Sequence, residues 1–148
     1  MPQPSLVDPR GLRFAAAITA VVLALVLVTP SPIREVLLAV QTLVFAVGAF
    51  VSLAASPWAW LFRTVVRPRL GEPAHTEDAR PPRFAQQVGL ALTLVGLVAL
   101  AAGLTTAGLV AVGLALTAAL LNAATGFCLG CELYLTTRRL AGRAGVGA

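Results

Sequence analysis

The sequence FAQQVGLALTLVGLVALAAGLTTAGLVAVGLALTAALLNAATGFCLGC, residues 84–131, runs from Phe84 to Cys131 without a charged side chain. An α-helix rises about 1.5 Å per residue and the hydrocarbon core of a bilayer is about 30 Å thick, so roughly 20 apolar residues make one crossing. This stretch is therefore long enough for two crossings. The segment 103–108, with two glycines and two threonines, is the best place for the turn between them.

Two shorter uncharged stretches come earlier in the chain. One covers positions 14–33, between Arg13 and Arg34, and the other covers positions 36–62, between Glu35 and Arg63. Each is long enough for one crossing. The segment 29–32, with two prolines, joins them as a tight turn and is a poor signal-peptide cleavage site, so we expect the first segment to stay as a permanent helix. The four predicted spans are 14–28, 33–54, 84–104 and 107–129.

Composition supports an all-α membrane protein with one domain of four transmembrane helices over residues 5–140. Hydrophobic residues make up 58% of the 148-residue chain and charged residues only 11%, against about 25% charged in an average soluble domain. The segment 141–148 is predicted to be a disordered tail. The basic residues flank apolar spans, so we expect no nucleic-acid partner. No charged residue lies deep in a span, which argues against a proton-coupled transporter or ion pump.

Arginines are distributed unequally between the two ends of the predicted spans. Ten of the eleven lie before the first span, between the second and third, or after the fourth, and only Arg34 lies on the other side. Short loops rich in arginine stay in the cytoplasm. Both termini and the loop 63–83 are therefore predicted to be cytoplasmic. Trp58 and Trp60, beside Arg63, predict a short interfacial helix over 57–66.

An internal repeat precedes the first and third spans. Residues 8–15 and 78–85 share the pattern D-x-R-x-x-R-F-A. Each copy opens a hairpin that crosses the membrane and returns. We interpret this as two similar helical hairpins in a parallel repeat, related by a pseudo-two-fold axis along the membrane normal.

The residues with the most evident chemistry are Cys128 and Cys131, the only two cysteines in the chain. The topology puts them at the cytoplasmic end of the fourth helix, where resting thiols are expected. A helix C-terminus would raise the pKa of a thiol, whereas a break at Gly126 that let Cys128 begin a new helix would favour the thiolate. The sequence leaves both arrangements open. Glu132 and Tyr134 are candidates for tuning or positioning the pair.

Three interpretations of the cysteine pair compete. Thiol redox or sulfur transfer is one. Metal binding is weaker, because two cysteines supply half of a tetrahedral site and the only histidine, His75, lies in another loop. The third is that two small, soft side chains simply pack at a helix end. We expect no cofactor and no metal.

Two motifs together resemble a known family. Residues 81–86, PPRFAQ, precede the third span, and residues 128–134, CLGCELY, close the fourth. With Val7-Asp8-Pro9-Arg10 and Arg13-Phe14, they resemble the bacterial membrane family called domain of unknown function 4395, over about residues 5–140. The resemblance implies a similar size and helix number. It also implies an association with thioredoxin-like and sulfurtransferase proteins, which favours thiol chemistry at Cys128 and Cys131.

The leading hypothesis is a multi-pass component of the bacterial cytoplasmic (inner) membrane that takes part in thiol or sulfur redox metabolism. Cys128 and Cys131 would cycle between dithiol and disulfide, or carry a persulfide, with a cytoplasmic thioredoxin-like or sulfurtransferase protein as partner. The alternative is a non-catalytic scaffold or accessory subunit of a larger membrane complex. Substrate, any transported species and homo-oligomerisation are left open by the sequence.

Overall fold

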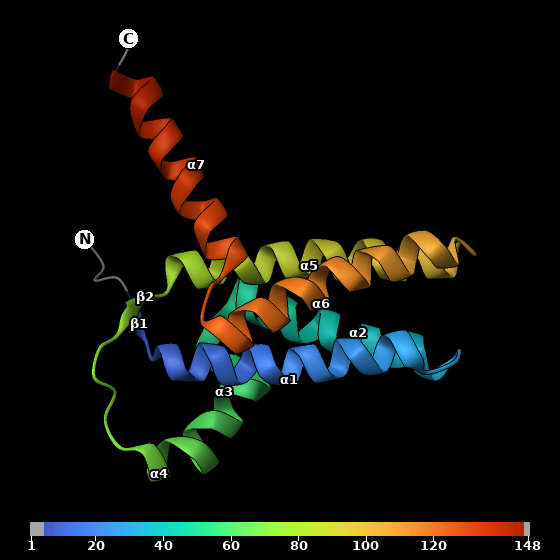
Figure 1. The fold of residues 1–148 in the computed structure, drawn as a ribbon, viewed down its shortest axis with the longest axis horizontal. Coiled ribbons are helices and arrows are strands. Elements are labelled where there is room, and N and C mark those ends of the chain that lie inside the picture. Colours follow the sequence, from blue (N-terminus) through green and yellow to red (C-terminus); the bar gives the residue numbers. More distant parts are fainter. Residues whose placement is uncertain (1–4, 147–148) are drawn as a thin grey trace.

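The computed structural model describes residues 5–146 and consists almost entirely of helices (Figure 1). Four helical segments are long and apolar enough to cross a membrane: Pro9–Val28, Ile33–Val51, Arg80–Ala101 and Thr105–Thr125. They overlap the four spans expected from the uncharged stretches, with ends that differ by up to five residues. The predicted all-α fold with four transmembrane helices is therefore confirmed.

The first hairpin is formed by the first two spans and the second by the last two, with short helices between the hairpins. In chain order the elements are β1 (Leu6–Val7), α1 (Pro9–Val28), α2 (Ile33–Ala46), η1 (Val47–Val51), η2 (Leu53–Ala55), α3 (Pro57–Leu61), η3 (Phe62–Val66), α4 (Arg67–Leu70), β2 (Glu77–Asp78), α5 (Arg80–Ala101), α6 (Thr105–Thr125) and α7 (Leu129–Val146).

The four spans form a closed bundle in which every helix has two neighbours. α1 packs against α2 and α6, and α5 packs against the same two helices from the other side (Figure 1). The buried centre is apolar and contains Leu23, Val26, Leu38, Val112 and Ala115. Outward-facing leucines and valines remain exposed along the spans. Such an outer surface fits hydrocarbon better than water, because lipid tails are as apolar as leucine.

Small residues let α5 and α6 approach closely. A Cβ added to Gly108 would lie 3.1 Å from the carbonyl oxygen of Gly96 on the neighbouring helix. The turn between these helices lies at Gly103, which has φ 78°, in the left-handed region that favours glycine. The turn predicted within 103–108 is thus at its N-terminal edge. One buried polar contact crosses the first hairpin, from the Gln41 amide to Thr19 Oγ1 at 3.3 Å.

The two halves repeat the same contacts. Asp8 forms an ion pair with Arg10 at 2.8 Å, and Asp78 pairs with Arg80 at 2.6 Å. β1 pairs antiparallel with β2, with Leu6 opposite Asp78, so the strands before α1 and α5 meet at one end of the bundle. A hydrogen bond from each arginine holds the pKa of its aspartate below the usual range near 3.8.

Each half also contains an aromatic pair at the equivalent position. The rings of Phe14 and Phe62 lie 5.7 Å apart at 46°, and those of Phe84 and Tyr134 lie 5.7 Å apart at 49°. Phe14 and Phe84 are the matched phenylalanines of the repeat motif. The segment α3–η3 therefore occupies, in the first half, the place that the start of α7 occupies in the second.

Two parts of the chain differ from the sequence prediction. The fourth span ends at Thr125 instead of 129, and a separate helix, α7, follows it and leaves the end of the bundle at an angle (Figure 1). Residues 141–146 of the expected disordered tail belong to this helix. The two alanines and the arginine of this segment are strong helix formers, which offsets its two glycines. Residues 147–148 lie outside the described part.

Candidate functional site

The C-x-x-C pair lies in the connection between α6 and α7. α6 ends at Thr125, and Gly126 follows with φ 76° while its N–H donates to the Asn122 carbonyl at 2.8 Å. This left-handed residue ends the helix as glycine commonly does. The expected position of the cysteines, at the end of the fourth helix, is therefore wrong. Cys128 lies directly before Leu129, the first residue of α7.

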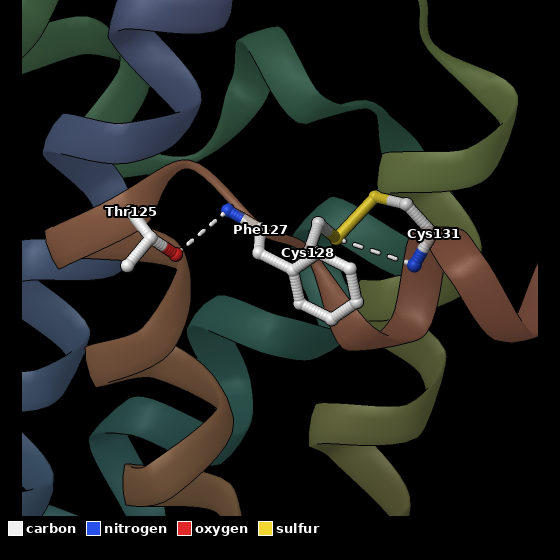
Figure 2. The surroundings of a disulfide bond; sticks show 4 residues. All are labelled: Thr125, Phe127, Cys128 and Cys131. Atoms are coloured by element: carbon white, nitrogen blue, oxygen red, sulfur yellow. Dashed lines mark hydrogen bonds between the residues drawn. A yellow bond between two sulfur atoms is a disulfide. The ribbon is translucent and has the colours of Figure 1, made fainter.

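The two cysteines are joined as a disulfide at the start of α7 (Figure 2). Their Cα atoms lie 5.2 Å apart, and the Cys131 N–H donates to Cys128 Sγ at 3.2 Å. The Cys128 carbonyl accepts the first hydrogen bond of the new helix, from the Glu132 N–H at 3.0 Å. Cys128 thus takes the position of a helix N-cap. Within a regular helix, Cβ atoms at i and i+3 lie about 5–6 Å apart, further than the about 3.5–4.5 Å that a disulfide needs, and the N-cap conformation of Cys128 lies outside that regular geometry.

The connecting residues are held by a further local bond. The Phe127 N–H donates to Thr125 Oγ1 at 3.2 Å, which closes the turn between the two helices (Figure 2). Phe127 is 45% exposed and Leu129 is 39% exposed. Both cysteines are half-buried, and in the sequence Cys128 lies between these two more exposed apolar residues.

Helix dipoles act on the pair from both sides. The C-terminus of α6 carries partial negative charge, whereas the N-terminus of α7 carries partial positive charge and exposed N–H donors. Cys128 lies at the α7 N-terminus and its Sγ accepts a hydrogen bond there, which is the kind of position at which reactive cysteines commonly occur. Of the two backbone arrangements that the sequence left open, the structure has the one with a break at Gly126.

α7 is fixed to the bundle by its first two turns. A Cβ added to Gly130 would lie 2.6 Å from both Cα and Cβ of Ala85, so the two helix backbones touch at this point. One turn later Tyr134 packs against Phe84 of α5. Both contacts fall within or just after the C-x-x-C motif, and they determine where the cysteines lie relative to the membrane end of the bundle.

The other sequence candidates have different surroundings. Glu132 is exposed, and its backbone is the part that meets Cys128. Tyr134 lies in the contact with α5, where it positions α7. Arg138 and Arg139 are exposed further along α7.

A residue that sequence reasoning did not connect with the cysteines is Arg13. Its Nη2 donates to the Ala123 carbonyl at 3.1 Å and to the Ala124 carbonyl at 3.2 Å, both in the last turn of α6. Its Cδ would lie 3.6 Å from a Cβ at Gly126. The repeated arginine of the D-x-R-x-x-R pattern was the available signal, but a contact between the first and the fourth span needs the three-dimensional fold.

The first half lacks this chemistry although it has the same framework. Ser56 precedes α3 as Cys128 precedes α7, and its carbonyl accepts from the Trp60 N–H at 3.0 Å. A hairpin can therefore be completed here without cysteine. The cysteine pair is an addition to the fold of the second half.

Within the described residues, 5–146, no group of three or more His, Cys, Asp or Glu side chains lies close enough together to hold a metal ion. The imidazole of His75 lies 3.8 Å from Glu77 in the loop before β2. That loop and the cysteine pair belong to different segments of the structure.

Fold and site together define a membrane protein of four transmembrane helices, built from two similar hairpins, with a dicysteine motif at the start of an additional helix. The chain belongs to the family described as a domain of unknown function, DUF4395, whose model matches residues 7–139. The resemblance expected from the motifs is thereby confirmed. Comparisons with curated proteins and with solved structures find no match.

Proposed function

We propose that this protein carries out thiol–disulfide exchange at the cytoplasmic face of a bacterial inner membrane, with Cys128 as the nucleophile and Cys131 as the resolving cysteine. The observation that carries the proposal is the position of Cys128 as N-cap of α7, bonded to Cys131 and accepting its N–H. Reactive cysteines commonly lie at helix N-termini, where the thiolate is stabilised.

The reaction balances as a two-electron exchange. In the reduced protein the Cys128 thiolate attacks a disulfide of the partner, forming a mixed disulfide and releasing one partner thiolate. Cys131 then loses its proton and attacks Cys128 Sγ. This step forms the Cys128–Cys131 disulfide and releases the partner as a dithiol, which has gained the two electrons and two protons that the membrane protein lost. The reverse sequence oxidises a partner dithiol.

The cytoplasmic assignment is supported by the arginine distribution. Ten of eleven arginines lie on the sequence segments next to this end of the bundle, and loops rich in arginine stay inside. β1, β2 and the start of α7 all lie at that end (Figure 1). The cysteine pair would then face soluble cytoplasmic proteins.

The proposed partner is a soluble thioredoxin-like or sulfurtransferase protein. Phe127, Leu129 and Leu133 are between 39% and 54% exposed around the pair and offer an apolar contact rim. An apolar rim next to a half-buried cysteine pair suits a partner whose own reactive cysteine lies in an apolar surface. Glu132, beside Cys131, would tune the pair, and Tyr134 would hold α7 in place.

The redox state of the native protein tests the proposal. Cells are quenched with acid, free thiols are alkylated, and the chain is analysed by mass spectrometry before and after a thiol-oxidant pulse. The pair should change reversibly between dithiol and disulfide. Thiols that stay unchanged under every condition would contradict exchange and favour the scaffold alternative.

The matched variant is Cys128→Ser with Cys131→Ser. Serine is nearly isosteric and the site lies at the end of the bundle, so the variant should insert and accumulate like the wild type while losing its sulfur-related phenotype. A joint loss of phenotype and abundance would indicate a packing role instead, because lost packing typically costs about 1–3 kcal/mol and lowers the amount of folded protein.

A further inference from the structure

The last turn of α6 points its free carbonyl groups toward the connection that carries Cys128. Such carbonyls have no partner within the helix and carry partial negative charge. Left alone, they would oppose a thiolate on Cys128. Arg13, on α1, donates to two of them, the carbonyls of Ala123 and Ala124, at 3.1 and 3.2 Å.

The same arginine also lies along the turn. The Arg13 side chain passes close to Gly126. A Cβ added at Gly126 would lie 3.6 Å from Arg13 Cδ and 3.8 Å from Arg13 Nε. Gly126 is the residue that separates α6 from the helix of the cysteines. One side chain therefore both compensates the negative helix end and supports the backbone that presents Cys128.

The internal repeat supplies a twin of this contact without cysteines. Arg83 on α5 donates through Nε to the Ala49 carbonyl at 2.7 Å and through Nη2 to the Phe50 carbonyl at 3.1 Å. These carbonyls end the second span, just as those of Ala123 and Ala124 end the fourth. Each hairpin thus caps the last helix of the other hairpin. Capping alone is a structural role shared by both arginines.

We infer that Arg13 is a positioning residue for the Cys128–Cys131 pair, acting through the end of α6 to favour the Cys128 thiolate. The inference rests on the thiol site of the proposed function and adds a residue from the other half of the molecule. Arg83, its symmetry mate, caps the end of the second span, which leads to Ser56 instead of a cysteine.

The other charged side chains near the connection between α6 and α7 either have partners of their own or are exposed. On α5, Arg80 pairs with Asp78 and Arg83 is bound to the end of the second span. On α7, Glu132 is exposed beside Cys131. α6 contains no charged residue. Arg13 is therefore the cation that the fold assigns to the helix end leading to Cys128.

The test uses the full-length protein purified in detergent, in a Cys131→Ser background that leaves Cys128 as the only thiol. Its rate of alkylation by iodoacetamide is measured from pH 5 to 10. Arg13→Gln should lower the rate at pH 7 by about two- to fivefold and move the titration upward in pH, because a charge at a helix end has roughly that effect. Arg83→Gln should leave both unchanged.

Thermal unfolding of every variant checks that it is folded. If Arg13→Gln does not fold, Arg13→Lys and Arg83→Lys replace the glutamine pair. Lysine keeps the charge, but its nitrogen lies one bond closer to Cα than the Nη2 that binds both carbonyls, so it reaches them less well. Only the change at position 13 should therefore slow alkylation, and by a smaller factor. Equal rates in the two arginine variants, whether both reduced or both unchanged, would overturn the inference.

Failure of the inference is distinguishable from failure of the proposed function. A wild-type pair that exchanges disulfides in cells but reacts with iodoacetamide independently of Arg13 refutes the inference alone. A Cys128 whose alkylation depends on Arg13, in a protein that never changes redox state in cells, supports the inference and refutes the exchange function.

Discussion

Replacing Gly130 by alanine should displace α7 from the bundle and disturb the cysteine pair that it carries. The new Cβ would lie 2.6 Å from Ala85 Cα and Cβ, about 0.8 Å inside the 3.4 Å at which ordinary contact begins. The nearest atoms include backbone, so no flexible side chain can yield. Overpacking of this kind typically costs about 1–3 kcal/mol.

The matched control is Gly142→Ala on the same helix. No atom lies within 4 Å of a Cβ at Gly142, so the substitution gains helix propensity of roughly 1 kcal/mol without a clash. Thermal unfolding followed by the fluorescence of Trp58 and Trp60 reports stability, and alkylation of the reduced protein reports access to Cys128. Gly130→Ala should lower the melting temperature and speed alkylation, whereas Gly142→Ala should do neither. Unchanged stability and thiol access in Gly130→Ala would refute the packing of α7 on α5.

Three further predictions concern the turns, the ion pairs and the topology. Gly126→Ala and Gly103→Ala should each destabilise the protein by about 1 kcal/mol, because both positions are left-handed, yet only the change at Gly126 should alter thiol reactivity. Since the pKa values of Asp8 and Asp78 are lowered in the folded state, their contribution to stability is present above their unfolded pKa near 3.9 and is lost as the pH falls through the folded values. Asp→Asn at both positions should therefore flatten the melting-temperature profile below about pH 4 and lower it at pH 7. A cysteine introduced at Arg69, in the cysteine-free double-serine background, should resist a membrane-impermeant maleimide added to intact cells and react after permeabilisation. Labelling from outside would reverse the proposed orientation.

Much of the fold could be predicted because its determinants are local. The lengths of the uncharged stretches correspond to bilayer thickness, so the four spans followed from counting residues between charges. The D-x-R-x-x-R-F-A pattern identified the two halves, and Gly103 lies in the one uncharged stretch that is long enough for two crossings.

Other features depend on contacts that local sequence does not contain. Gly126 ends α6, whereas Gly108 and Gly113 lie within the same helix without breaking it, so glycine alone did not indicate the start of α7. The link from Arg13 to the last turn of α6 joins the beginning of the first span to the end of the fourth. The cysteine pair was therefore recognised from its spacing, but its place at a helix start and its relation to Arg13 followed only from the packed bundle.

The most direct test of the exchange mechanism is capture of a mixed disulfide. Removing the resolving cysteine by Cys131→Ser should leave Cys128 attached to its partner as a mixed disulfide. This adduct should run as a heavier species on a non-reducing gel and should be cleaved by dithiothreitol. Mass spectrometry should identify the partner in it as a thioredoxin-like or sulfurtransferase protein. The same experiment with Cys128→Ser should give no such species. Absence of an adduct in Cys131→Ser, or equal adducts in both variants, would contradict Cys128 as the nucleophile of a thiol-exchange protein.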